Sequence, residues 1–138
     1  MILIGKIPKS HQEALAYFAR YLLTPQLLRH IIIRVVYRRN ISFLGCVEVL
    51  EYNSRNMPRE FVVEIKHGQT EEEYLRTLAH EMIHVKQYAL GELNEQMDLW
   101  LGEKYESDRI AYHKQPWEIE AHDLSEVLLY EYNRRSHV

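Results

Sequence analysis

Residues 79–88 read AHEMIHVKQY and contain two histidines and a glutamate in the order His-Glu-x-x-His, at His80, Glu81 and His84. Imidazole nitrogens are good zinc ligands, and histidines four positions apart lie within about 40° of each other on a helix. Glu81 lies about 100° further round and can reach a water near a metal without binding the metal. Chance alone produces this pattern in about one of twenty chains of this composition, so its context has to be weighed.

The helix expected around this pattern has a defined start, end and apolar face. Thr70 and Glu73 have the spacing of a capping box, and Gly91 predicts the end of a helix over about 71–90. Its apolar face consists of Leu75, Leu78, Met82, Val85 and Ala89. The two histidines lie on the opposite face, and we therefore predict that they point together into a cleft.

Two histidines do not complete a metal site, so a third ligand is needed. The downstream candidates are His113, Glu118, Glu120 and His122. Pro116 predicts the start of a last helix over about 117–134. The apolar direction of this helix is set by Ala121, Leu124, Leu128, Leu129 and Tyr132. Glu118 lies about 60° from that direction and Glu120 about 100° on the other side, so Glu118 is favoured and Glu120 is the alternative.

The rest of the chain predicts an α+β domain. Ser10 is a candidate N-cap for an N-terminal helix in HQEALAYFARYLL. Three β-rich segments follow, at residues 30–39, 42–52 and 59–67. They predict a small three-stranded sheet, mixed or antiparallel. Residues 92–116 are expected to form an irregular loop in which LWLGEKY makes a short hairpin.

The composition fits a single domain over residues 1–138, and its net charge of −3 does not favour a nucleic-acid partner. The basic clusters RVVYRR and NRR, with Arg34, Arg38, Arg39, Arg134 and Arg135, are interpreted as solvated faces. The single Cys46 excludes an internal disulfide and is expected to be a small buried side chain. No segment is long and apolar enough to span a membrane, and a cytoplasmic location is expected.

HEMIH, followed by a helix in which Glu118 precedes Ala121 by three positions, resembles the gluzincin class of zinc metallopeptidases. The order of elements resembles the SprT-like and minigluzincin proteins. The strings HEMIHVKQY and PWEIEA are similar to small metallopeptidases of bacteriophages and bacteria. The resemblance covers about residues 60–130 and implies a zincin-like fold in which Zn²⁺ is held by His80, His84 and Glu118. It also implies a bacterial or phage-infected cell, or a virion, as the location.

The sequence departs from related patterns at three places. Gln87 and Leu90 occupy the positions where a metzincin carries glycine and a third histidine, so that class is excluded. No cysteine pairs are present to build the zinc ribbon that SprT-like proteins commonly carry, which weakens a role in DNA-dependent proteolysis. His122 stands where gluzincins often have an aspartate that orients a ligand histidine, and Asp123 or Glu120 is left for that task.

The resemblance implies hydrolysis of peptide or protein substrates. Glu81 is expected to act as the general base that takes a proton from the attacking water and passes it to the leaving amine. Tyr112 and His113, just before the third ligand, are candidates for stabilising the oxyanion. The strand in residues 59–67 is expected to hold substrate by strand addition if it borders the cleft.

Two other functions stay open. The first is a structural or assembly protein of zincin fold, including a virion component, whose metal site is not catalytic. The presence of Glu81, which adds nothing to metal affinity, favours an enzyme instead. The second is a nucleic-acid-associated protease of SprT-like type. The oligomeric state is left open.

Overall fold

The computed structural model describes residues 1–135, which form an α+β fold around a four-stranded mixed sheet. The strands are β1 (Ile2–Ile4), β2 (Ile32–Arg38), β3 (Gly45–Tyr52) and β4 (Pro58–Lys66). Strands β1, β2 and β4 are parallel to one another, and β3 runs antiparallel to β4 at the end of the order β1-β2-β4-β3. Strand β3 is therefore an edge strand, with one side of its backbone free of ladder hydrogen bonds.

The three predicted strands are confirmed, but the expected three-stranded sheet is wrong because β1 adds a fourth strand. Only three residues long and half exposed, β1 is too short for an alternating pattern to be visible. Along β4 the buried positions alternate, since Phe61, Val63 and Ile65 are all buried and the residues between them are only partly covered. Strand β4 lies between β2 and β3, so it has no free edge.

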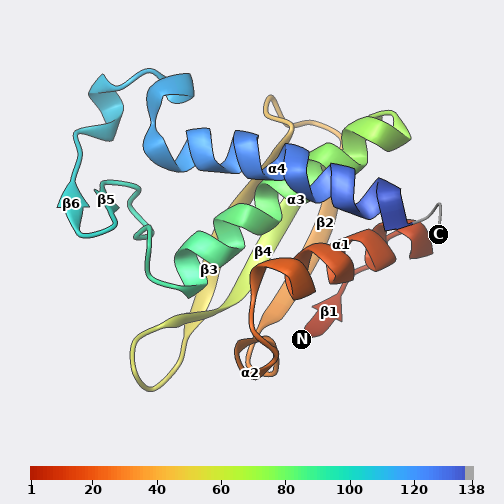
Figure 1. Cartoon of the computed structure of the whole chain (residues 1–138), viewed down its shortest axis with the longest axis horizontal. Helices are drawn as coiled ribbons and strands as arrows, with labels where there is room; N and C mark the ends of the chain where they lie inside the picture. Colours follow the sequence, from red (N-terminus) through yellow and green to blue (C-terminus); the bar gives the residue numbers. More distant parts are fainter. Residues whose placement is uncertain (136–138) are drawn as a thin grey trace.

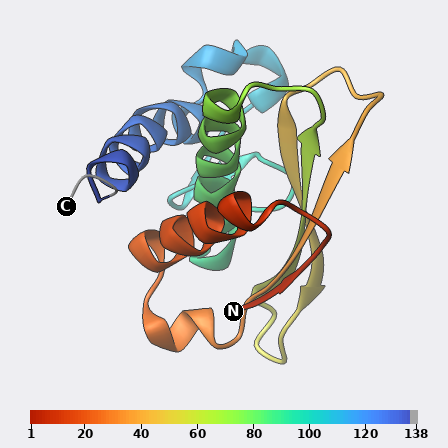
Figure 2. The ribbon, with the colours of Figure 1, turned by 90° about the vertical axis from the view of Figure 1, so that its right-hand side faces the viewer.

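The helices cover one face of the sheet (Figures 1 and 2). They are α1 (Lys9–Leu22), α2 (Pro25–Leu28), α3 (Glu71–Ala89) and α4 (Pro116–Arg135). Helix α3 lies between the sheet and α4, and α1 packs beside it (Figure 2). This central place makes α3 the most enclosed helix, with buried side chains on several faces. None of the helices among the described residues is both long and apolar enough to cross a membrane.

The ends of α3 and α4 agree with the sequence, whereas the start of α1 does not. The Thr70 hydroxyl accepts a hydrogen bond from the Glu73 N–H, and the Glu73 carboxylate accepts one from the Thr70 N–H, which completes the predicted capping box. Ser10 is not an N-cap, because α1 already begins at Lys9 with Pro8 at the cap position. The proline ring holds φ at −54°, so the chain enters the helix two residues earlier than the serine predicts.

The loop before α4 forms the predicted hairpin from β5 (Leu99–Trp100) and β6 (Glu103–Lys104). Two short 3₁₀ turns follow, at Ser107–Arg109 and Tyr112–Lys114. The Trp117 ring at the start of α4 contacts the Trp100 and Tyr105 rings at centroid distances of 6.4 and 5.8 Å. These contacts hold the hairpin against the first turn of α4, and so help to position that turn.

Candidate metal centre

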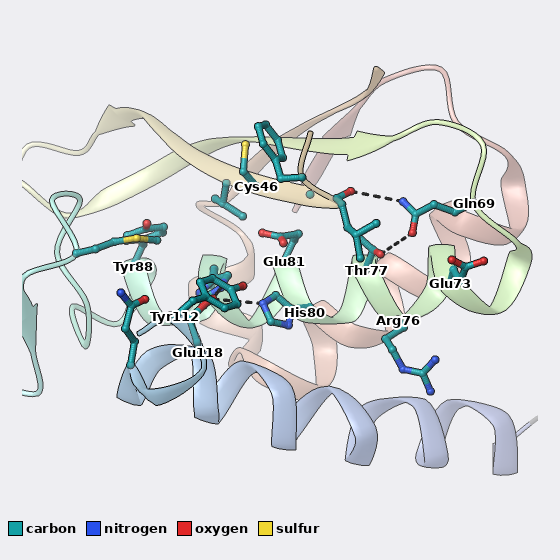
Figure 3. Close-up of a pocket in the computed structure, with 17 residues that line it drawn as sticks. Cys46, Gln69, Glu73, Arg76, Thr77, His80, Glu81, Tyr88, Tyr112 and Glu118 are labelled. Atoms are coloured by element: carbon teal, nitrogen blue, oxygen red, sulfur yellow. Dashed lines mark hydrogen bonds and ion pairs between the residues drawn. The ribbon is translucent and has the colours of Figure 1, made fainter. Parts of the chain in front are cut away.

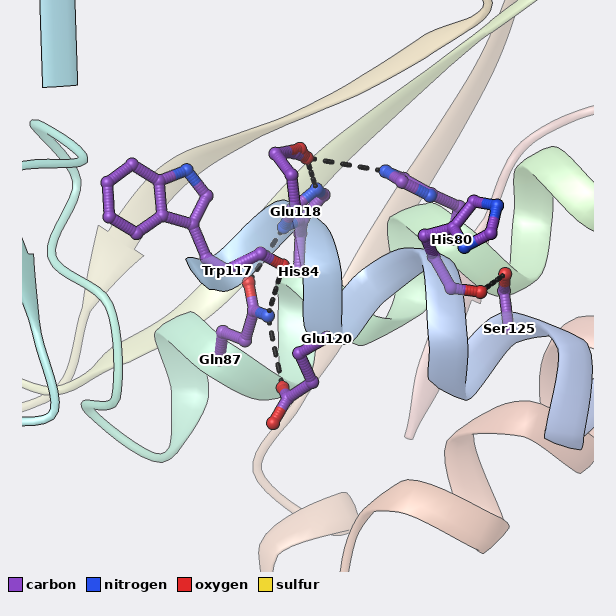
Figure 4. A network of polar contacts seen from close by, with 8 residues as sticks. His80, His84, Gln87, Trp117, Glu118, Glu120 and Ser125 are labelled. Carbon is purple, nitrogen blue, oxygen red and sulfur yellow. Dashed lines mark hydrogen bonds and ion pairs between the residues drawn. The ribbon is translucent and has the colours of Figure 1, made fainter. Parts of the chain in front are cut away.

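Three predicted metal ligands converge between α3 and α4. His80 and His84 come from consecutive turns of α3, and Glu118 comes from the first turn of α4. The Glu118 Oε1 atom lies 2.6 Å from His84 Nε2 and 3.4 Å from His80 Nε2 (Figure 4). One ligand atom from each of the three residues lies within 4.8 Å of the other two.

The packing of α4 against α3 explains this convergence. The apolar stripe of α3 faces the sheet and α1, which leaves the opposite face for α4. That face is more covered than the sequence predicts, since the His84 side chain is 5% exposed and the His80 side chain 21%. Glu118 is also buried, because Trp117 and Ala121 anchor its turn in the core. The pair of histidines therefore faces a neighbouring helix as well as a cleft.

The cleft is a pocket of about 540 Å³ between α3 and β3, with His80, His84 and Glu118 in its wall. Glu81 lies between β3 and the His80–Glu118 pair (Figure 3) and is 5% exposed. Gly45 lets the edge strand approach α3 closely here. A Cβ atom at this position would lie 3.0 Å from the Glu81 side chain and 2.9 Å from Thr77 Cγ2.

The donor set fits a zinc ion. Two imidazole nitrogens and a carboxylate oxygen are ligands that zinc prefers, and tetrahedral ligands at zinc are about 3.3 Å apart. The His80–Glu118 distance of 3.4 Å already matches this spacing, whereas the His84–Glu118 contact of 2.6 Å is a hydrogen bond that an ion would widen. Within the described part of the chain, Glu81 Oε2 and Glu118 Oε2 are buried without a hydrogen-bond partner. Buried carboxylate oxygens without partners are costly, and a bound ion and its water would satisfy them.

The charges of the site perturb its pKa values in the metal-free protein. Burial opposes ionisation of Glu118, but the hydrogen bonds from His80 and His84 lower the pKa of its carboxyl to about 2. Burial likewise opposes protonation of His84, yet its hydrogen bond to Glu118 and the charge of Glu81 raise the pKa of the ring. For Glu81, burial raises the pKa above its usual value, against the opposing effect of the two histidines. A carboxyl with a raised pKa is suited to accept and release protons near neutral pH.

The other candidate ligands lie elsewhere. Glu120, the alternative to Glu118, accepts hydrogen bonds from Lys86 Nζ at 2.9 Å and Gln87 Nε2 at 3.1 Å. His122 is exposed beside Asp123, at 3.3 Å, and neither contacts a site histidine. The prediction that Asp123 orients a ligand histidine is therefore wrong. Glu120 is linked to His84 only through Gln87.

The two oxyanion candidates differ in position. Tyr112 is 65% exposed but lines the pocket that contains Glu81, where lost hydration and the nearby Glu118 carboxylate raise the pKa of its phenol. His113 is exposed and lines only a second, smaller cavity, which shares His80, Tyr112 and Glu118 with the first. The prediction for His113 is therefore not supported by its position, because its ring lies outside the pocket where Glu81 would act.

Sequence reasoning missed several residues of the site. Gln87 and Tyr88 both reach it, Gln87 by a hydrogen bond to His84 and Tyr88 as a wall of the pocket. A signal for Gln87 was present, since a polar residue three positions after His84 lies on the same face of the helix.

Cys46 is half buried rather than buried, and its sulfur points away from Glu81 (Figure 3).

The arginines of the two basic clusters are mostly paired. Arg34 contacts Glu60 at 3.1 Å and Arg38 contacts Glu64 at 3.2 Å, both across neighbouring strands. Arg134 pairs with a glutamate of its own helix at 2.8 Å, and Arg135 stacks over two tyrosine rings. The contacts of Arg34, Arg38 and Arg134 agree with the interpretation of the clusters as solvated faces.

Comparisons of the chain with models of protein families, with curated proteins and with solved structures gave no match. The arguments about function therefore rest on the geometry of the site.

Proposed function

We propose that this protein is a zinc-dependent metallopeptidase of gluzincin type and zincin-like fold. The observation that carries the proposal is the convergence of His80, His84 and Glu118 beside Glu81, whose buried carboxylate has an unpaired oxygen facing the same pocket. Three protein ligands leave a fourth position on zinc, which is the arrangement of catalytic rather than structural zinc sites. Structural sites normally use four protein ligands, and the described residues offer only three in this cluster.

Each residue has a distinct role in the proposed reaction. Zinc held by the three ligands would polarise a water molecule and lower its pKa toward neutrality. Glu81 accepts a proton from the attacking water and delivers it to the nitrogen of the leaving amine. Glu81 is placed for both steps, because its buried carboxylate lines the same pocket as the three ligands. The Tyr112 hydroxyl donates to the oxygen of the scissile carbonyl as negative charge develops there.

The substrate is an extended polypeptide bound along β3. Strand β4, the strand expected to receive it, has both edges paired, so that expectation is wrong. Strand β3 offers a free edge, and its start at Gly45 lines the pocket. Phe43 and Leu44, at the rim of the pocket, are 42% and 58% exposed. Backbone hydrogen bonds along the edge strand would give affinity, and these apolar side chains favour an apolar residue in the substrate.

The test combines zinc analysis with cleavage of a denatured protein or a peptide library. Wild-type protein is expected to hold about one zinc per chain and to cleave, whereas Glu81→Gln retains zinc and loses cleavage. Glu73→Gln is the matched control, because Glu73 lines the same pocket and glutamine preserves the capping box.

Three outcomes would contradict the proposal. Wild-type protein without zinc affinity would remove its basis. Zinc binding without cleavage, unchanged in Glu81→Gln, would instead support a structural or assembly protein with a non-catalytic metal site. Salt-sensitive binding to DNA, with cleavage only in its presence, would favour a nucleic-acid-associated protease.

A further inference from the structure

Gln87 lies one turn beyond His84 on α3, and its side chain is completely buried. Its Oε1 atom lies 2.7 Å from His84 Nδ1, on the side of the imidazole ring that faces away from Glu118 (Figure 4). No other described side chain contacts this ring nitrogen by a hydrogen bond. Gln87 therefore determines whether His84 Nδ1 donates or accepts a hydrogen bond.

The orientation of the Gln87 amide is determined by its other two contacts. Its Nε2 atom donates to the Trp117 carbonyl oxygen at 3.0 Å and to Glu120 Oε1 at 3.1 Å. A carbonyl and a carboxylate can only accept, so both hydrogens of the amide nitrogen are used there. Rotating the amide by 180° would place its oxygen against two acceptors. The amide oxygen must therefore face His84.

The state of the His84 ring follows from that orientation. An amide oxygen only accepts, so His84 Nδ1 must carry a hydrogen and donate it. The other ring nitrogen, Nε2, faces Glu118 at 2.6 Å and is the one that can offer a lone pair to a metal ion. We propose that Gln87 is a positioning residue that keeps the proton of His84 on Nδ1 and so reserves Nε2 for the metal. This inference rests on the proposed function, because it concerns the same metal site.

Glu120 and Lys86 hold Gln87 in place. Lys86 Nζ contacts Glu120 Oε1 at 2.9 Å and Glu92 Oε1 at 2.8 Å, so Glu120 is fixed from its outer side. Glu120, the alternative metal ligand of the sequence prediction, therefore contacts Gln87, which in turn contacts His84. The chain Lys86–Glu120–Gln87–His84 links α3 and α4 by contacts that also bring Glu118 to the site.

The first measurement reports the ring proton directly. In protein labelled with ¹⁵N-histidine, wild type is expected to show a slowly exchanging N–H resonance on His84 Nδ1, with and without zinc. Gln87→Leu keeps a similar volume but removes the acceptor, so this resonance should be lost to exchange with solvent. Because the resonance exists without zinc, this measurement tests the role of Gln87 even if the wild-type protein were to bind no metal.

The second measurement is zinc affinity, by competition with a chromophoric chelator. Loss of an outer hydrogen-bond partner typically weakens metal binding by about 10–100-fold, and Gln87→Leu is expected to fall in this range. Gln87→Glu combined with Glu120→Gln restores an acceptor for His84 Nδ1–H. The amide introduced at position 120 can then donate to the carboxylate introduced at position 87. This double variant is expected to recover the Nδ1–H resonance and part of the lost affinity, because the carboxylate at position 87 does not donate to the Trp117 carbonyl as Gln87 does.

Ser125→Ala is the matched control. Ser125 is a buried polar residue of α4 whose hydroxyl donates to the His122 carbonyl of the same helix at 2.7 Å. Its loss should leave both measurements unchanged. A Gln87→Leu variant with wild-type zinc affinity and a protected Nδ1–H would overturn the inference. So would a folded double variant that has no more zinc affinity than Gln87→Leu.

Discussion

Helix α3 carries a buried histidine–glutamate contact at each end, and only one of them has the features of a reactive site. At the C-terminal half, His84 Nε2 lies 2.6 Å from Glu118. At the N-terminal end, His11 of α1 reaches Glu71 in the first turn of α3, with 2.8 Å between Nε2 and Oε2. Both histidine side chains are almost fully buried, at 5% and 3% exposure.

The two clusters differ in their remaining partners. The second ring nitrogen of His11 contacts the Tyr37 hydroxyl at 2.5 Å, and the Tyr37 ring stacks on Tyr74 at 5.4 Å. None of the buried, unpartnered polar atoms of the described residues belongs to this cluster, whereas Glu81 and Glu118 each contribute one. Burial and a short histidine–glutamate distance are therefore not enough to indicate chemistry. Unsatisfied carboxylate oxygens that face a pocket make the difference.

The largest expected effect is the loss of zinc from Glu118→Ala. Removing one of three protein ligands should weaken binding well beyond the roughly 100-fold that loss of an outer partner costs. Glu71→Ala, the equivalent change in the other cluster, should bind zinc like wild type. Chelator competition measures both variants. If Glu118→Ala kept its zinc while Glu120→Ala lost it, the choice of third ligand would be wrong.

The second effect concerns stability, and here the other cluster should dominate. His11→Ala removes two hydrogen bonds and the packing against Tyr37 and Tyr74, and should lower the free energy of unfolding by about 2–4 kcal/mol. Zinc stoichiometry should not change. Denaturant titration of the zinc-free variant measures the loss. Reduced zinc binding by the folded variant would show that the two clusters are coupled.

Removal of zinc should lower stability only through the site cluster. With free zinc at 100 times its dissociation constant, chelation should lower the free energy of unfolding by about 2.7 kcal/mol. His11→Ala should show the same increment, whereas Glu118→Ala should show none. Unfolding curves with and without chelator provide the comparison. An equal increment in Glu118→Ala would mean that zinc binds elsewhere.

Glu81→Gln should make the zinc-free protein more stable at pH 7, by about 1 kcal/mol, because it removes a buried carboxylate with an unpaired oxygen. Burial raises the folded-state pKa of Glu81 above its ordinary value of 4.5, so the folded protein binds more protons than the unfolded chain above that pH. The penalty is therefore absent below about pH 4.5 and grows as the pH rises. Unfolding at pH 5 and pH 7 should show the smaller difference at pH 5. An equal difference would contradict the assignment.

The smallest effect is expected from Glu71→Gln. The Glu71 side chain is 60% exposed, and an amide oxygen can still accept from His11, so the loss should stay below about 1 kcal/mol. Thermal unfolding resolves a change of that size. A loss as large as that of His11→Ala would mean that the charge of Glu71 stabilises the cluster more than its exposure indicates.

Local patterns predicted the parts of this protein that depend on neighbours in the sequence. The capping box at Thr70, the end of α3 near Gly91 and the start of α4 at Pro116 all arise from contacts within one helical turn. The preference for Glu118 over Glu120 also came from a periodicity, because the apolar direction of α4 has to face the core. For these features, spacing along the chain is equivalent to direction in space.

Contacts between segments that are distant in the sequence could not be predicted from spacing along the chain. Strand β1 and the edge position of β3 depend on which strands pair, and pairing leaves little trace in segments of three to eight residues. That Tyr112 lines the pocket and His113 does not depends on the path of a loop. The role inferred for Gln87 needed Trp117 and Glu120, which lie about thirty positions further along the chain.

The sequence by itself determined the helix with His80, Glu81 and His84, its ends, and the helix that carries Glu118. Only the tertiary structure decided that these helices meet, that β3 borders the pocket, and that the His11 cluster is satisfied while the His84 cluster is not. The physical reason is that helix periodicity and capping act over a few residues. Whether a buried polar atom is satisfied depends on every segment that packs around it.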